Sequence, residues 1–481
     1  MTPIHVTNAT TTSEPVRPLK ISKPGRAPVT HNACTVCLPL GVSLAFRGVE
    51  NAVVILHGSQ GCATYIRRYL ISHFKEPVDI ASSSFTEASA VFGGAQNLKT
   101  AIDNVRTGYQ PAIIAIGSTC LADTIGEDVS MIVRQYLKEH EGETDLPLFV
   151  PLPMPNSRGT HIDGLHQACR AAVEYLSLGP EDEAQAPVES VHEELKAPVG
   201  IFPGLVSPAD IRYLKELVRD CGLRPVVLPD LSETMEGGLW DRYEPIPKGG
   251  TTPTEFAALR EALGTVEFST TVRKDCSAAE LLQDRLGTPL LRMPLPVGIA
   301  ATDLFIGTLT AWSGTEIDHA HQRERDRLID AYADGHKYLS GLRVAVFGEE
   351  DLVLGLSGFL KEVGMEVVIA GTGGRTSQLA AEMQRLYGAG PEILLEDTDF
   401  EALREVVAEA QPDMLIGNSK GYSLSRALSI PLVRVGFPIH DRFGAARVQV
   451  CGYRGTQMLF DRIVNTVIEE RQAESIGYPY M

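Results

Sequence analysis

A short apolar strand, a glycine-containing turn and a helix-like pattern recur in this order along the chain, and this unit limits the possible folds more than any other feature. Val53–Leu56 is a continuous apolar run that ends at His57–Gly61, and Ala112–Ile116 ends in the same way at Gly117–Cys120. Strands of a parallel sheet read as uninterrupted apolar runs, because helices cover both faces of the sheet. The pattern therefore predicts α/β domains of the doubly wound type.

The same unit recurs through the rest of the chain. Further strands are expected at 199–202, 225–228, 344–347, 367–370, 414–416 and 432–435. Helices are expected at Ile125–Leu137, Ile211–Val218 and Leu352–Val363. At roughly 150 residues per domain, a chain of 481 residues has room for about three domains. We therefore predict three Rossmann-like domains, each a mainly parallel sheet flanked by helices.

Two polar stretches suggest where these domains begin and end. Residues 1–30 are rich in Thr, Pro and Lys and have no apolar periodicity, which predicts an extended N-terminal arm. The acidic stretch 181–199 contains two prolines and is suited to a linker. The predicted α/β domains then span 31–195, which holds the cysteines discussed below, 196–335 and 336–481.

The overall charge and the apolar runs exclude several classes of protein. Forty-three Lys and Arg against 61 Asp and Glu give a net charge of −18, so nucleic acid and anionic membrane surfaces would be repelled. The chain has no run of 18 apolar residues, and its N-terminus lacks the apolar core of a secretory signal. We expect a cytoplasmic protein without a nucleic-acid or membrane partner.

Three of the eight cysteines stand at positions where ligands bind. Cys62 and Cys120 follow predicted strands directly, and Cys37 lies 25 residues before Cys62 and precedes an apolar segment. Cysteines so far apart converge only if the fold brings the carboxyl ends of adjacent strands together, as a parallel sheet does. Thiolates that converge without histidine suit an iron–sulfur cluster better than Mg²⁺. The alternative is that each cysteine is a small buried apolar side chain.

The other cysteines have a weaker claim to function. Cys34-x-x-Cys37 could suggest a zinc or thioredoxin-like site, but zinc needs a second Cys or His pair and only His31 is near. Four further cysteines are expected to be structural: Cys169 and Cys221 in or at the end of helices, Cys276 near a helix start, and Cys451 in a late strand.

Four motifs, in this order, resemble the β-type chain of nitrogenase component 1: Leu56–Tyr65, His73–Pro77, Ala90–Gly94 and Ser118–Asp128. Two segments of the C-terminal third resemble the same family, Asp413–Ser419 and Arg434–Pro438. The resemblance covers most of the chain. It implies a homologous α-type catalytic chain as partner, an α2β2 heterotetramer, and an ATP-dependent iron protein that delivers electrons.

The resemblance also implies roles for particular residues. In that family each chain contributes three cysteines to an [8Fe-7S] P-cluster at the α–β interface, and the matching residues here are Cys37, Cys62 and Cys120. Tyr65 matches a tyrosine between this cluster and the iron–sulfur cofactor of the α-type chain, which this chain does not bind. Phe92 matches an aromatic residue on the surface that docks the iron protein. For both aromatic residues, plain packing is the alternative. No catalytic residue is expected in this chain.

Three departures from the family pattern bear on function. Asn156 stands where the β chain often has a serine that ligates the oxidised cluster, so that role is absent or moved to Ser157. Cys276 and His440 invite comparison with the cofactor ligands of the α-type chain, but their surroundings do not match. The turn at Gly348–Asp351 lacks the glycines of a nucleotide site, which puts ATP hydrolysis on the separate iron protein.

The sequence leaves three functions to choose from. Loops at 228–232, 249–252 and 452–456 resemble the second chain of the scaffold on which the nitrogenase cofactor matures, but that chain usually lacks the full cysteine triad. A dinitrogen-reducing β chain is the second possibility. The favoured one is the β-type subunit of a nitrogenase-like methylthio-alkane reductase, which cleaves a carbon–sulfur bond reductively for sulfur metabolism.

Overall fold

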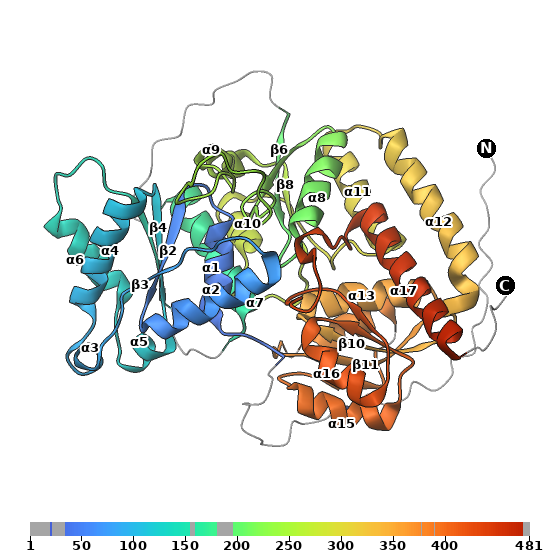
Figure 1. Ribbon diagram of the computed structural model, residues 1–481. Helices are drawn as coiled ribbons and strands as arrows, with labels where there is room; N and C mark the ends of the chain where they lie inside the picture. Colours follow the sequence, from blue (N-terminus) through green and yellow to red (C-terminus); the bar gives the residue numbers. More distant parts are fainter. Residues whose placement is uncertain are drawn as a thin grey trace.

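The computed structural model describes residues 20–21, 34–153, 159–179, 196–376, 378–388 and 390–474. Three separate parallel sheets, each accompanied by helices, follow one another along this part of the chain (Figure 1). The predicted α/β class with parallel sheets is therefore confirmed. The predicted linker 181–199 falls largely outside the described residues, and the second sheet begins with Pro198.

The first sheet holds the strands that precede the cysteine turns. Across the sheet the strands are β3 (Ala81–Ser82), β2 (Ala52–His57), β4 (Ile113–Ser118) and β5 (Leu148–Leu152), all parallel. The helices of this part are α1 (Leu38–Arg47), α2 (Gln60–Phe74), α3 (Glu87–Phe92), α4 (Ala95–Tyr109), α5 (Cys120–Thr124), α6 (Val129–Glu139) and α7 (His161–Ala172).

The second sheet is built in the same way. Its strands, in order across the sheet, are β7 (Arg224–Val227), β6 (Pro198–Phe202), β8 (Gly264–Glu267) and β9 (Leu290–Arg292). The helices of this part are α8 (Pro208–Asp220), α9 (Pro253–Ala258), α10 (Ala278–Leu286), α11 (Ile299–Ser313) and α12 (His319–Leu339). The last of these, α12, leads directly into the third sheet.

The third sheet has six strands and takes its edge from the N-terminal arm. Its order is β1 (Lys20–Ile21), β12 (Ile393–Leu395), β11 (Glu366–Thr372), β10 (Arg343–Gly348), β13 (Met414–Gly417) and β14 (Leu432–Arg434). Its helices are α13 (Glu350–Glu362), α14 (Leu379–Tyr387), α15 (Phe400–Ala410), α16 (Tyr422–Leu428) and α17 (Gly452–Glu474). A part of the arm therefore lies on this chain itself, since β1 pairs with β12.

The predicted strands and helices correspond to elements of the structure, although the helix expected from Ile125 begins only at Val129 and Cys451 lies outside any strand. Cys451 was expected in a late strand, but it lies in a bend directly before α17. The backbone N–H groups of Val450 and Cys451 both donate to the buried carboxylate of Asp210, at 2.9 Å each. This segment is held by a side chain rather than by a neighbouring strand, which a local apolar pattern does not reveal.

Successive residues of β2 face two different cores. Val54 and Leu56 belong to a large apolar cluster that also includes Ile201 of the second sheet and Val346 of the third. Val53 and Ile55 belong to a smaller cluster beneath α4 and α6. The alternation follows from the two-residue period of a strand. The large cluster joins all three sheets into one continuous core.

Two glycines allow α1 to cross α7 with their backbones in contact. A Cβ on Gly41 would lie 1.8 Å from the carbonyl oxygen of His161, and one on Gly164 would lie 2.1 Å from that of Leu38. These are backbone atoms, so no side chain can turn away to make room. The crossing fixes the start of α1, and with it Cys37.

No helix within the described residues has the length and apolar character that spanning a bilayer requires.

The Gly41→Ala variant tests this crossing. The added methyl group would force α1 and α7 apart, and we expect it to lower the free energy of unfolding by about 1–3 kcal/mol. Gly108→Ala is the matched control, because Gly108 lies at an exposed position of helix α4 with open space around it. The control should gain about 0.5–1 kcal/mol. Denaturant unfolding measures both; equal midpoints for the two variants would contradict the crossing.

Candidate functional site

The ends of β2 and β4 bring two of the cysteine-bearing turns together. The strands pair in parallel register with His57 opposite Ser118, so the chain leaves both strands at the same edge of the sheet. The backbone N–H and the hydroxyl of Thr119 both donate to the carbonyl of His57, at 3.1 and 3.0 Å. Gly58 packs so closely that a Cβ there would lie 2.0 Å from the Thr119 hydroxyl. The two turns therefore touch.

Each turn leads into a helix whose first turn carries a cysteine. Cys62 is the third residue of α2, and Cys120 is the first residue of α5. The first backbone N–H groups of a helix lack helical partners and give that end a partial positive charge, which favours a thiolate. The first turn of α2 has no acidic residue to offset this effect. The hydroxyl of Ser59 lies 3.8 Å from the Cys62 sulfur.

Cys37 reaches the same place from a third helix. It is the N-cap residue of α1, and its backbone forms an isolated antiparallel bridge with Thr160, the N-cap of α7. On the same side the N–H of His161 donates to the carbonyl of Val36 at 2.8 Å. The α1–α7 crossing thus holds Cys37 at the edge where β2 and β4 end.

The electrostatics of Cys37 show that the three thiols are neighbours. Surrounding protein withdraws water from the sulfur and raises the pKa of Cys37, and the charges of Cys62 and Cys120 raise it further. Cys37 and Cys120 are nevertheless exposed on the surface, and Cys62 is half-buried. Within the described residues, the three sulfur atoms do not form a group whose atoms all lie within 4.8 Å of one another.

The five remaining cysteines are buried and belong to packing. They are Cys34, Cys169, Cys221, Cys276 and Cys451. Burial raises the pKa of the Cys34 thiol to about 12 and that of Cys221 to about 11. Cys34 packs in the core beside the third sheet, whereas Cys37 faces the surface, so the Cys34-x-x-Cys37 pair does not present two thiols to one ion. His31 lies outside the described residues.

Phe92 lies on the surface close to this edge. It ends α3 with its side chain 89% exposed, beside Val91 at 75%. The carboxylate of Glu127 accepts the N–H of Gly94 at 2.7 Å through one oxygen and lies 3.3 Å from the His57 ring through the other. The segment that carries Phe92 is therefore tied to the residue at which β2 ends.

Tyr65 begins a row of aromatic rings that the motifs did not reveal. It is 55% exposed and lies one helical turn beyond Cys62. Its ring centre is 5.7 Å from that of Tyr69, which in turn lies 4.9 Å from His440 and 5.6 Å from Phe437. Phe437 and His440 follow β14, the edge strand of the third sheet. Phe437 was visible in the motif Arg434–Pro438, and His440 follows it two residues after Pro438, but the contact of either with α2 was not visible.

Other residues singled out in the sequence lie elsewhere. Cys276 contacts the guanidinium of Arg273 at 3.1 Å, whereas His440 contacts the hydroxyl of Ser72 at 2.5 Å, so these two residues have different surroundings. The position of Asn156 and Ser157 falls outside the described residues.

The acids after β10 are packed into the protein rather than arranged around a phosphate. Glu349 lies 3.2 Å from the ring of buried His161. Burial, together with the negative charges of Asp351, Asp163 and Glu349, raises the pKa of Glu350 to about 8. A segment of neighbouring acids offers a pyrophosphate no positive charge, in line with the missing nucleotide motif.

The exposure of the cysteines predicts which of them react in the metal-free chain. Under native conditions iodoacetamide should modify Cys37, Cys62 and Cys120, because their sulfur atoms are reachable, and should leave the five buried cysteines unmodified. Peptide mass spectrometry after a short reaction gives the extent at each position. Faster labelling of Cys221 than of Cys120 would contradict the arrangement.

Comparison with known proteins agrees with this geometry. Residues 37–468 match the family model described as nitrogenase component 1 type oxidoreductase. The chain is 32% identical over 452 residues to the nitrogenase molybdenum-iron protein beta chain of Clostridium pasteurianum, which covers 92% of this chain and 94% of that protein. It is 33% identical over 452 residues to the nitrogenase iron-molybdenum cofactor biosynthesis protein NifN of Bradyrhizobium diazoefficiens, and the match covers 94% of this chain and 92% of that protein.

The fold agrees over the same length. The solved structure of nitrogenase Cp1 at pH 6.5 superposes with a TM-score of 0.86 at 30% identity, covering 97% of this chain and 98% of that one. A second chain, from nitrogenase Cp1 at pH 5, shares the fold at 16% identity with a TM-score of 0.67. The match to the family model and the sequence identities to the β chain and to NifN show that this protein is a β-type member of the nitrogenase component 1 family of oxidoreductases.

Proposed function

We propose that this chain is the electron-relay β-type subunit of a nitrogenase-like reductase, in which Cys37, Cys62 and Cys120 bind a P-cluster-type [8Fe-7S] cluster together with a homologous α-type chain. The observation that carries the proposal is the gathering of these three thiols at three helix N-termini around one surface, while the other five cysteines are buried. A family match alone would not assign ligands.

The residues present fit such a cluster. Three thiols without histidine are the soft donor set that iron–sulfur clusters take. Their sulfur atoms do not all lie within 4.8 Å of one another, so the arrangement does not call for a single shared ion. When bound, the cluster would supply a centre that accepts and gives up electrons. Exposure of Cys37 and Cys120 leaves room for ligands from a partner chain.

The surrounding protein has two tasks at this surface. The starts of α1, α2 and α5 hold the three cysteines at one surface. An α-type chain that covers the surface would exclude water and oxygen, which is the role we assign to the interface of an α2β2 heterotetramer. The partner chain would also carry the iron–sulfur cofactor at which substrate is reduced. This chain would supply no acid, base or nucleophile.

Two exposed aromatic residues are assigned to the electron path. Phe92, on the projecting end of α3, would contact the ATP-dependent iron protein, since a large exposed apolar side chain is a common anchor of a protein interface. Tyr65 would line the route from the cluster towards the cofactor of the α-type chain. Its contact with Tyr69 extends this aromatic row into the third domain.

The favoured substrate is a methylthio-alkane, cleaved at its carbon–sulfur bond. The chain is as similar to NifN, at 33% identity, as to a nitrogenase β chain, at 32%. Equal similarity to both supports the proposal that this chain belongs to neither group. Asn156 in place of a cluster-binding serine also departs from the dinitrogen enzyme. A dinitrogen-reducing β chain and a maturation scaffold are the alternatives. The complete cysteine triad favours a chain that passes electrons onward.

Cysteine variants test the cluster assignment. Cys62→Ala or Cys120→Ala in the purified complex should remove the P-cluster-like EPR signal and abolish electron transfer, because a ligand thiolate is lost. Cys221→Ala is the control, as Cys221 is buried at the end of α8, and it should keep both. Full activity of the Cys62 or Cys120 variant would refute the assignment. A wild-type complex with only a [4Fe-4S] signal would favour the scaffold.

Gas chromatography separates the possible substrates. The complete system, with α-type chain, iron protein and ATP, is given a methylthio-alkane in one reaction and dinitrogen in another. The favoured function predicts release of methanethiol and a hydrocarbon in the first and no ammonia in the second. Ammonia from dinitrogen without methanethiol would replace this proposal by the dinitrogen-reducing β chain.

A further inference from the structure

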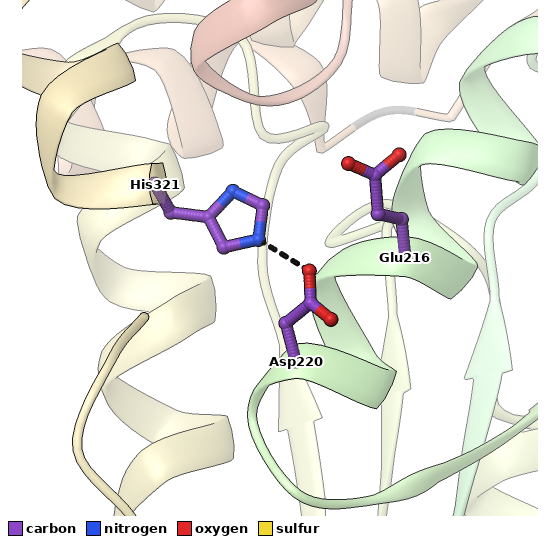
Figure 2. A group of neighbouring side chains, drawn as sticks. All are labelled: Glu216, Asp220 and His321. Carbon is purple, nitrogen blue, oxygen red and sulfur yellow. Dashed lines mark hydrogen bonds and ion pairs between the residues drawn. The ribbon is translucent and has the colours of Figure 1, made fainter. Parts of the chain in front are cut away.

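A second group of potential metal ligands lies between α8 and α12, apart from the cysteine surface. Within the described residues, Glu216, Asp220 and His321 place one ligand atom each within 4.8 Å of one another (Figure 2). The two acids are one helical turn apart on α8 and project towards the histidine at the start of α12. In Figure 1 these helices lie on the other side of the molecule from α5.

The histidine is fixed in the orientation that a metal ligand needs. The His321 side chain is only 3% exposed, and its Nε2 atom lies 2.8 Å from Asp220. Its Nδ1 atom faces the carboxylate of Glu324 at 3.4 Å. A carboxylate that accepts the proton of one ring nitrogen leaves the lone pair of the other free for a metal, and this arrangement is common behind metal-bound histidines.

The distances and donor types suit a small divalent ion. Ligand atoms around a tetrahedral zinc ion lie about 3.3 Å apart, and the atoms of this group lie within 4.8 Å of one another, so shifts of about 1.5 Å at most bring them to that spacing. One imidazole nitrogen with two carboxylate oxygens is a typical donor set for Zn²⁺. The side chains of Glu216 and Asp220 are 44% and 40% exposed, so water can complete the coordination.

The charges around the group leave an excess that a divalent ion would neutralise. With a neutral imidazole, the carboxylates of Glu216, Asp220 and Glu324 carry −3, and Arg454 contributes +1. The remaining −2 equals the charge of one divalent cation. Arg454 binds both Glu216 and Glu324, at 2.9 and 2.7 Å, so it competes for one of the ligands. A carboxylate has enough lone pairs to keep one contact with Arg454 while it binds a metal.

We propose that Glu216, Asp220 and His321 form a binding site for a divalent first-row metal ion such as Zn²⁺, with Glu324 as the residue that positions the imidazole. The ion would tie α8 of the second domain to α12, the helix that leads into the third sheet, and Arg454 of α17 lies against the same site. The role is structural, and it does not depend on the cluster or on the substrate proposed above.

Zinc binding to the full chain tests the proposal. Chelator-treated protein is dialysed against a series of Zn²⁺ concentrations, and bound zinc is counted by mass spectrometry. Because thiols also bind zinc, the readout is the difference between variants that keep every cysteine. His321→Gln should bind one zinc ion fewer per chain than wild type. His319→Gln, which changes an exposed histidine two residues earlier on α12, should bind as many as wild type.

Two further variants separate a metal site from a mere ion-pair network. Asp220→Asn, at the half-exposed end of α8, should lower the affinity for the same zinc ion about tenfold or more, a loss typical even of changes outside the direct ligands. Arg454→Gln should raise that affinity, because the competing cation is gone. Zinc should raise the melting temperature of wild type more than that of His321→Gln, since each ion that binds the native state stabilises it. Equal zinc content and affinity in wild type, His321→Gln and Asp220→Asn would overturn the proposal.

Discussion

The parallel pairing of β2 with β4 is the constraint on which the rest of the site depends. With His57 opposite Ser118, both strands end at one edge, and the Thr119–His57 hydrogen bonds hold the two following turns in contact. Two helices then start side by side, each with a cysteine in its first turn. The α1–α7 crossing brings the third cysteine, Cys37, to the same edge. Cysteines distant in sequence become neighbours because the strand register, the helix starts and the close helix crossing all place them at this edge of the sheet.

The same edge links the cysteines to the surface where Phe92 projects. His57 ends β2, and its ring packs edge-on against Phe85 with ring centres 4.8 Å apart, just before α3. Glu127 joins the His57 ring to the backbone of Gly94 just after α3. The segment that carries α3 is therefore anchored to the end of β2 on both sides, in agreement with the docking role proposed for Phe92.

Local patterns were enough to predict the sheets, because continuous apolar runs determine buried parallel strands, and the strand ends led to Cys62 and Cys120. Contacts between distant parts of the chain were beyond such reasoning. Cys451 was misplaced in a strand because its backbone N–H is held by Asp210, 241 residues away. The approach of His440 to Tyr69, and of α12 to α8, likewise depends on packing between segments far apart in the chain, for which the sequence carries no periodic signal.

The most direct test of the account is an electron cryo-microscopy structure of this chain in complex with its α-type partner, prepared without oxygen. The account predicts one multi-iron cluster at the interface, bonded to the sulfur atoms of Cys37, Cys62 and Cys120 and to the partner chain. A structure in which these three sulfur atoms have no iron bound, or in which the cluster is held by other residues of this chain, would contradict it.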